Sequence, residues 1–159
     1  MRRFLCMILF FALILGGCSG KESASFYYCR NDYIYNSADG VITSEKRDIT
    51  GHADDLGLLV SLYLMGPLEK NLHSPFPAET KLISVDTSDT TLVLTISDVG
   101  YALSESEYTL ACTCLALTCL EFTQSSTVTI VSGEKSISID PAQLTLYDSA
   151  LPVPTETGG

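Results

Sequence analysis

Apolar and polar positions alternate along several short stretches of this chain, with the period expected of strands that bury one face. The alternation is clearest over residues 91–96, where Leu92, Leu94 and Ile96 fall on one side. An aromatic run at residues 26–35 is followed by the turn sequence Asn-Ser-Ala-Asp-Gly and a second extended stretch, which predicts a hairpin. The predicted strands and extended pieces cover residues 26–35, 41–49, 81–85, 91–96, 127–131, 137–139 and 144–147.

Two stretches have the longer period of an amphipathic helix. Over residues 52–65, apolar side chains recur at three- and four-residue spacing, two aspartates fall in the expected first turn, and Gly66-Pro67 ends the pattern. The second stretch opens with Ser104-x-x-Glu107, the spacing of a capping box, and is predicted to continue to about Phe122.

This order of elements predicts an α+β fold, with a mainly antiparallel sheet packed against two helices. No internal repeat or second domain is visible in the sequence. We expect one domain at residues 26–148 and a flexible, proline- and glycine-rich C-terminal tail at 149–159.

The N-terminal segment has the organisation of an export signal. Arg2 and Arg3 precede an apolar run of about twelve residues, which is too short to span a bilayer comfortably. The run ends in Leu-Gly-Gly-Cys, which resembles a bacterial lipobox, the cleavage site before a lipidated cysteine. We therefore expect a signal peptide at 1–17, lipidation (palmitate) of Cys18 and a tether at 18–25; an ordinary signal peptide or short membrane anchor is the alternative.

The charge of the chain sets limits on its partners. The formal net charge is −10, and removal of residues 1–17 takes it to about −12 because that segment carries two arginines and no acids. Such an acidic chain is poorly suited to nucleic acid or to anionic lipid. We expect no nucleic-acid partner, and attachment to the extracytoplasmic face of the cell membrane through the lipid on Cys18, since two acyl chains anchor a protein stably.

The cysteines are the first candidates for chemistry. Cys112, Cys114 and Cys119 lie within one predicted helix, where their spacings do not permit a disulfide with each other and do not converge on one metal ion. Buried core thiols are the favoured interpretation, a disulfide from Cys29 to one helix cysteine is a second, and a metal or redox site is a third. Neither histidine has a partner at a recognisable spacing, and the sequence contains no hydrolase, zinc-protease or phosphate-loop motif. The expectation is a protein without enzymatic activity, metal or cofactor.

Two groups of residues are candidates for a binding surface. Glu45 and Arg47 fall on the same face of a predicted strand, where they form either an exposed ion pair or part of an interface. Tyr27 and Tyr33 belong to the aromatic run, whose exposed rings could stack on cell-wall sugars.

These features together resemble a single GerMN domain, a family of sporulation and spore-germination proteins found in bacterial envelope lipoproteins. The resemblance begins at the aromatic strand near Phe26 and includes Glu45-x-Arg47, the helix LGLLVSLYLMGP and the proline-containing loop after it. It continues through the strands at 81–85 and 91–97 and closes with the second helix and the strand that follows. The resemblance implies a ring-building-motif-like α+β sandwich, a role in envelope assemblies and no catalytic residues.

The sequence therefore predicts a lipid-anchored envelope protein that presents one GerMN-like module for assembly with another envelope protein or with itself. A role in sporulation or germination is implied by the resemblance alone. The alternative function is a cell-wall glycan-binding lipoprotein that uses the tyrosine-rich first strand.

Overall fold

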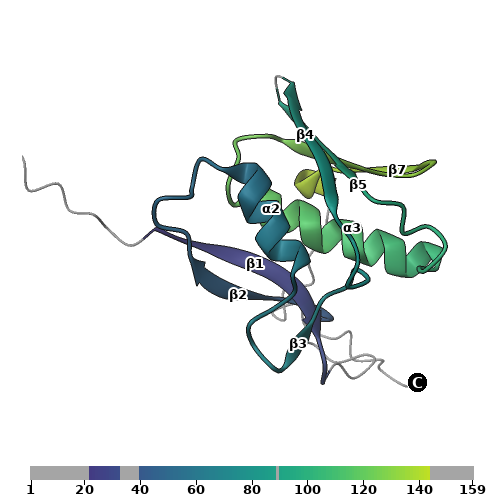
Figure 1. The fold of residues 1–159 in the computed structure, drawn as a ribbon, viewed down its shortest axis with the longest axis horizontal. Helices are drawn as coiled ribbons and strands as arrows, with labels where there is room; N and C mark the ends of the chain where they lie inside the picture. Colours follow the sequence, from purple (N-terminus) through teal and green to yellow (C-terminus); the bar gives the residue numbers. More distant parts are fainter. Residues whose placement is uncertain (1–21, 33–39, 89, 144–159) are drawn as a thin grey trace, which may run out of the picture.

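The computed structural model describes residues 22–32, 40–88 and 90–143, and these form two sheets and two helices. The elements in chain order are β1 Ser23–Arg30, β2 Ile42–Asp48, α2 Leu56–Leu64, β3 Leu72–His73, β4 Leu82–Ser88, β5 Thr91–Ile96, α3 Glu105–Leu120, β6 Thr127–Ser132, β7 Lys135–Ile139 and the 3-10 turn Pro141–Gln143 (Figure 1). The Cys18 lipidation site, Tyr33 and the predicted extended piece at 144–147 lie outside the described residues.

The two sheets have different topologies. The first has the order β2-β1-β3 and is antiparallel throughout. The second has the order β4-β5-β6-β7, in which β5 and β6 are parallel and the outer pairs are antiparallel. The parallel pair arises because α3 connects β5 to β6, the crossover that parallel neighbours require.

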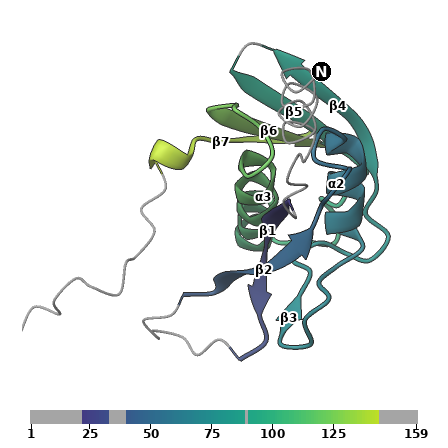
Figure 2. The ribbon, with the colours of Figure 1, turned by 90° about the vertical axis from the view of Figure 1, so that its left-hand side faces the viewer.

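Helix α3 lies between the two sheets, with β1 on one side and β6 and β7 on the other (Figure 2). This position explains its composition, because a helix covered on more than one side needs small or apolar side chains all round. The buried residues of α3 are Tyr108, Ala111, Cys112, Thr113, Cys114, Leu115, Ala116, Thr118 and Cys119. The described part of the chain contains no helix that is long and apolar enough to cross a bilayer.

The α+β class and both helices are confirmed, with corrections at the element ends. The capping box of α3 is formed by Ser104 and Glu107, as the sequence predicts. Helix α2 begins at Leu56 rather than near residue 52, and Asp55 is its N-cap, accepting a hydrogen bond from the Leu58 amide at 2.9 Å. Strand β4 continues to Ser88, three residues beyond its predicted end at residue 85, because it pairs with β5 along its whole length.

Strand β1 begins at Ser23, three residues before the predicted start of the domain. Glu22 is also attached to the domain, since its carbonyl accepts a bond from the Ile49 amide at 2.9 Å and its amide donates to Thr50 Oγ1 at 3.1 Å. Residues 22–25, which were expected to belong to a tether at 18–25, are therefore part of the domain.

Candidate functional site

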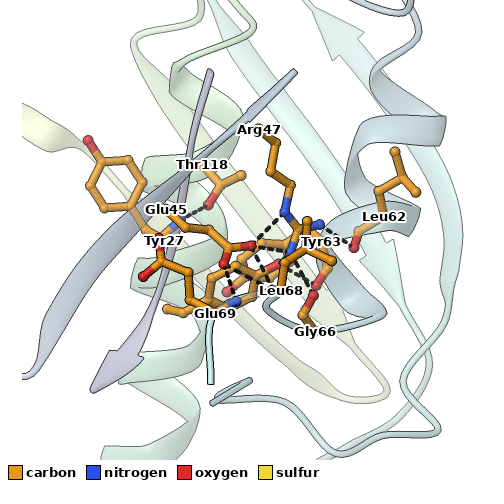
Figure 3. A network of polar contacts seen from close by, with 10 residues as sticks. Tyr27, Glu45, Arg47, Leu62, Tyr63, Gly66, Leu68, Glu69 and Thr118 are labelled. Atoms are coloured by element: carbon orange, nitrogen blue, oxygen red, sulfur yellow. Dashed lines mark hydrogen bonds and ion pairs between the residues drawn. The ribbon is translucent and has the colours of Figure 1, made fainter. Parts of the chain in front are cut away.

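Glu45 and Arg47 form a buried ion pair at the centre of a polar network. They lie two positions apart on β2, so both side chains point to the same side of the strand. Their side chains are 2% and 10% exposed, and Arg47 Nε donates to Glu45 Oε1 at 2.6 Å (Figure 3). The interpretation of this pair as an exposed ion pair or interface is wrong, because the end of α2 and the following loop cover it.

Glu45 holds the loop that follows α2. Its carboxylate accepts hydrogen bonds from the backbone amides of Leu68, at 3.0 Å, and Glu69, at 2.8 Å. Charged acceptors form stronger hydrogen bonds than neutral ones, so this carboxylate fixes the backbone at two successive residues.

Arg47 holds the C-terminal end of α2 itself. Its guanidinium donates to the carbonyl of Leu62 at 3.1 Å and to the carbonyl of Gly66 at 2.6 Å. The last carbonyls of a helix lack partners within the helix, and a cation there also opposes the negative end of the helix dipole. Gly66 has a φ of +96°, a conformation that glycine adopts readily and that turns the chain out of the helix.

Aromatic side chains of β1 and α2 complete this network, which we call the Glu45–Arg47 clamp. The Arg47 guanidinium carbon lies 4.6 Å from the ring centre of Phe26 and 5.5 Å from that of Tyr28. The Tyr28 hydroxyl accepts from Arg47 at 2.9 Å and donates to the Tyr63 carbonyl at 3.0 Å, and the two tyrosine rings stack with centres 4.8 Å apart. Burial raises the pKa of Tyr28, so the hydroxyl keeps its proton and remains a donor.

The ionisation of Glu45 links this clamp to pH. Burial alone raises the pKa of Glu45, but the amide bonds from Leu68 and Glu69 and the bond and charge of Arg47 outweigh it, and the pKa falls below its usual value of 4.5. The folded state therefore binds the Glu45 proton more weakly than the unfolded state does. The stabilisation is complete above pH 4.5 and is lost as the pH falls through the folded-state pKa.

We expect the free energy of unfolding to fall less steeply below pH 4.5 in a Glu45→Gln variant than in the unchanged protein. Asp32 and Glu107 also have lowered pKa values and contribute to the loss of stability at low pH in both proteins. The difference between the two stability curves therefore gives the contribution of Glu45. Urea titrations at intervals from pH 3 to pH 7 measure this difference. Parallel curves for the two proteins would show that Glu45 is not ionised preferentially in the folded state.

The clamp presents two large apolar side chains to solvent. Met65, the C-cap of α2, is 83% exposed, and Leu68, whose amide is held by Glu45, is 78% exposed. Met65 also borders a shallow groove of about 290 Å³, lined by Ser61, Leu64, Met65, Ala78, Thr80, Lys81 and Leu82. We call Met65, Leu68 and this groove the α2-end surface. The sequence does not predict this surface, since the helical pattern marks the buried face and gives no signal for apolar residues just beyond the helix.

The tyrosine-rich strand is mostly internal. Phe26 and Tyr28 are fully buried, and Tyr33 lies outside the described residues. Tyr27 is partly buried, its hydroxyl donates to Glu121 at 3.2 Å, and its backbone amide donates to Thr118 Oγ1 at 2.9 Å. Among the described rings of this strand, Tyr27 is therefore the one that remains a candidate for contact with a ligand.

All four cysteines in the described part of the chain, Cys29, Cys112, Cys114 and Cys119, are buried free thiols. Within residues 22–32, 40–88 and 90–143, no group of three or more His, Cys, Asp or Glu side chains is arranged to hold a metal ion. His52 lines a second shallow pocket of about 410 Å³ with Glu22, Asp54 and Asp55, and His73 Nδ1 lies 2.8 Å from Asn31 Oδ1. These surroundings do not form a nucleophile–base arrangement.

Comparison with known proteins identifies the fold. No protein-family model matches the sequence, and no curated protein matches it significantly. Among solved structures, the chain is similar to the first GerMN domain of the sporulation protein GerM from Bacillus subtilis, with a TM-score of 0.55 and 13% identity over 73% of this chain and 86% of that one. It is also similar to the tandem GerMN domains of the same protein, with a TM-score of 0.51 and 17% identity over 76% of this chain and 42% of that one. A candidate lipoprotein of Clostridium perfringens aligns over 82% of this chain and 97% of its own, with 16% identity and a TM-score of 0.45.

The chain therefore has the α+β fold of GerMN domains, as the sequence resemblance predicts. The two GerMN structures compared above come from the sporulation protein GerM. At these identities the comparison establishes the fold, and the function has to be argued from the surfaces of this chain.

Proposed function

We propose that this protein is a lipid-anchored, non-enzymatic envelope protein that uses the α2-end surface to bind a second GerMN-like module. The observation that carries the proposal is the clamp, which uses a buried carboxylate and a buried guanidinium to fix a loop whose Leu68 side chain is 78% exposed. A large apolar side chain that is held rigidly in water exposes apolar surface at a cost in free energy. Burial against a partner removes that cost.

Rigidity of this surface favours binding. A loop that is ordered before association loses little conformational freedom on binding, so more of the contact energy appears as affinity. The clamp supplies this order through four backbone contacts, which involve the carbonyls of Leu62 and Gly66 and the amides of Leu68 and Glu69. Exposed Met65 lies at the edge of an open groove, the combination of anchor and pocket that strong interface residues use, and exposed Leu68 follows three residues later.

A second copy of this chain is the first partner to consider. GerM of Bacillus subtilis contains tandem GerMN domains, so two modules of this fold occur together in that protein, and a second copy of this chain offers a module of the same fold. The formal net charge of −10 makes two copies repel at low ionic strength. Association through an apolar surface is therefore expected to strengthen as salt screens that repulsion.

The anchor orients the domain in this proposal. With Cys18 lipidated, residues 19–21 extend at most about 11 Å between the membrane surface and the attached Glu22. The start of β1 lies beside the loop that leads into α2, to which Glu22 is bonded through Ile49 and Thr50 (Figure 1). The α2-end surface lies at the other end of α2, nine residues or about 14 Å further along the helix axis, where it remains accessible to a partner. A link to sporulation or germination rests on the origin of the solved GerMN domains.

The proposal is tested on the mature chain extracted in detergent. Light scattering at low and at physiological salt measures self-association of the unchanged protein and of Met65→Asp and Leu68→Asp variants. Ile83→Asp is the matched control, since Ile83 is a 66% exposed apolar residue on β4. We expect Leu68→Asp to weaken association at least tenfold and Ile83→Asp to leave it unchanged.

Two further results decide between the alternatives. A photoreactive residue at position 68 that cross-links to a different envelope protein, with no self-association, replaces the second copy by that protein as the partner. Self-association that survives both substitutions removes the α2-end surface from the proposal.

The lipid anchor has its own test. The intact mass of the protein extracted from its membrane is expected to include acyl chains on Cys18, and an unlipidated mass would exclude the anchor.

A further inference from the structure

Two thiols from distant parts of the chain meet in the core. Cys29 lies on β1 and is 1% exposed, and Cys114 lies on α3 and is fully buried. Each thiol shifts the pKa of the other, so the two side chains lie within interaction range. Both cysteines are free in the structure, so the pair is a dithiol.

The packing of β1 along α3 holds this pair in register. The Tyr27 amide donates to Thr118 Oγ1 at 2.9 Å, and the same hydroxyl donates to the Cys114 carbonyl at 2.9 Å. From Tyr27 to Cys29 is two strand residues, or about 7 Å, and from Thr118 back to Cys114 is about one helical turn, or 6 Å. The Tyr27–Thr118 hydrogen bond fixes one point of contact between β1 and α3. Moving from this point by about the same distance along each element reaches Cys29 on β1 and Cys114 on α3, which therefore lie opposite each other.

The other helix thiols have different surroundings. Burial raises the pKa of the Cys112 thiol to about 12. Cys119 is fully buried, and its pKa is raised by burial alone. Of the three helix cysteines, Cys114 is the one that shifts the pKa of Cys29.

We propose that Cys29 and Cys114 form a disulfide in the exported protein. The inference rests on the exported location given under the proposed function, because disulfides form and persist in oxidising compartments. The oxidant is the disulfide of a thiol–disulfide oxidoreductase. Two S–H bonds of this chain are replaced by one S–S bond, two protons are released, and the two electrons reduce the oxidoreductase disulfide to a dithiol.

The exchange takes two steps. One thiolate of the pair attacks the oxidoreductase disulfide, and the other thiolate then attacks the mixed disulfide and displaces the oxidoreductase thiolate. Because both thiols are inaccessible in the folded domain, this exchange takes place while the chain folds after export.

The bond would join the anchored strand to the central helix. Strand β1 follows directly after the segment that carries Cys18, and α3 contacts both sheets. The disulfide closes a loop that runs from residue 29 to residue 114, or 86 residues, and long loops lose the most freedom in the unfolded chain. We expect the oxidised protein to have a Tm about 10 °C above that of the reduced protein.

The test uses the full chain with its own leader, exported by a bacterial host and purified without reductant. Intact mass after blocking of free thiols counts the disulfides, since the oxidised protein is about 2 Da lighter before blocking and carries two fewer blocking groups. Peptide mapping without reduction is expected to find residues 29 and 114 in one linked fragment. Cys112→Ala and Cys119→Ala are the matched controls and are expected to retain the link, while Cys29→Ala and Cys114→Ala lose it.

The two proposals fail in distinguishable ways. A lipidated protein with four blocked domain thiols, which stays reduced when refolded with oxidised glutathione, overturns the disulfide and leaves the anchor intact. A linked fragment in a protein without lipid on Cys18 supports the disulfide and removes the anchor. Linkage of Cys29 to Cys112 or Cys119 in place of Cys114 also contradicts the inference, because it breaks the register set by Tyr27 and Thr118.

Discussion

Replacing Arg47 with methionine is expected to lower the free energy of unfolding by about 3–5 kcal/mol. The substitution leaves the Glu45 carboxylate, with its side chain 2% exposed, without its cationic partner in the core. It also removes the donors to the carbonyls of Leu62 and Gly66, so the end of α2 loses its cap. Methionine keeps most of the length of the side chain, which separates the loss of charge from the loss of packing.

The measurement is urea denaturation of Arg47→Met at pH 7, with Lys46→Met as the matched control. Lys46 is the neighbouring residue on β2 and points to solvent, so its replacement is expected to change stability by less than about 0.5 kcal/mol. A Glu45→Met, Arg47→Met double variant is expected to lose less than the sum of the single losses, because neither charge is then left unpaired. Additive losses, or an Arg47→Met loss as small as that of Lys46→Met, would show that the pair acts as two independent surface charges.

The elements that the sequence predicts well are those set by local periodicity. Leu92, Leu94 and Ile96 are at most 1% exposed, as the alternation in β5 indicates, and the Ser104–Glu107 capping box marks the start of α3. These signals act over two to four residues, and the side chains involved meet within one element. Tertiary contacts then move element ends by a few residues, as in α2 and β4.

The division into two sheets could not be predicted in the same way. The parallel pairing of β5 with β6, and the separation of β1–β3 from β4–β7, depend on contacts between residues far apart in the chain. Alternation in a strand marks its buried face and carries no information about its neighbours. The sequence order was consistent with one mainly antiparallel sheet, and the position of α3 between the sheets decided otherwise.

The candidate site was predicted only in part, because contacts between distant parts of the chain are not visible in local sequence patterns. The spacing of Glu45 and Arg47 gave their common face on a strand, but their burial depends on a loop more than twenty residues later in the chain. The spacing of Cys112, Cys114 and Cys119 excluded disulfides within the helix, but the register of β1 on α3 was needed to select Cys114 as the neighbour of Cys29.

Phe26→Ala is expected to lower the free energy of unfolding by about 3–5 kcal/mol, whereas Tyr27→Ala is expected to lower it by less than about 1.5 kcal/mol. The two rings are adjacent in the aromatic run, and the pleat of β1 sends them to opposite sides. Phe26 is fully buried, meets the Phe122 ring edge-on at 5.3 Å and supports the Arg47 guanidinium at 4.6 Å. Its removal leaves a cavity between β1 and α3 and withdraws a contact from the clamp.

Tyr27 is partly buried, and its side-chain bond to Glu121 is exposed, so water replaces that bond when the ring is removed. Its backbone bond to Thr118 does not depend on the side chain and survives the substitution. Thermal and urea unfolding of both variants measure the contrast, and equal losses would contradict the assignment of the two faces. Because Tyr27→Ala is expected to stay folded, its retention on purified cell wall is a clean test of the glycan-binding alternative. Lost retention in a stably folded Tyr27→Ala protein would favour that alternative, and unchanged retention would leave the α2-end surface as the binding region of this domain.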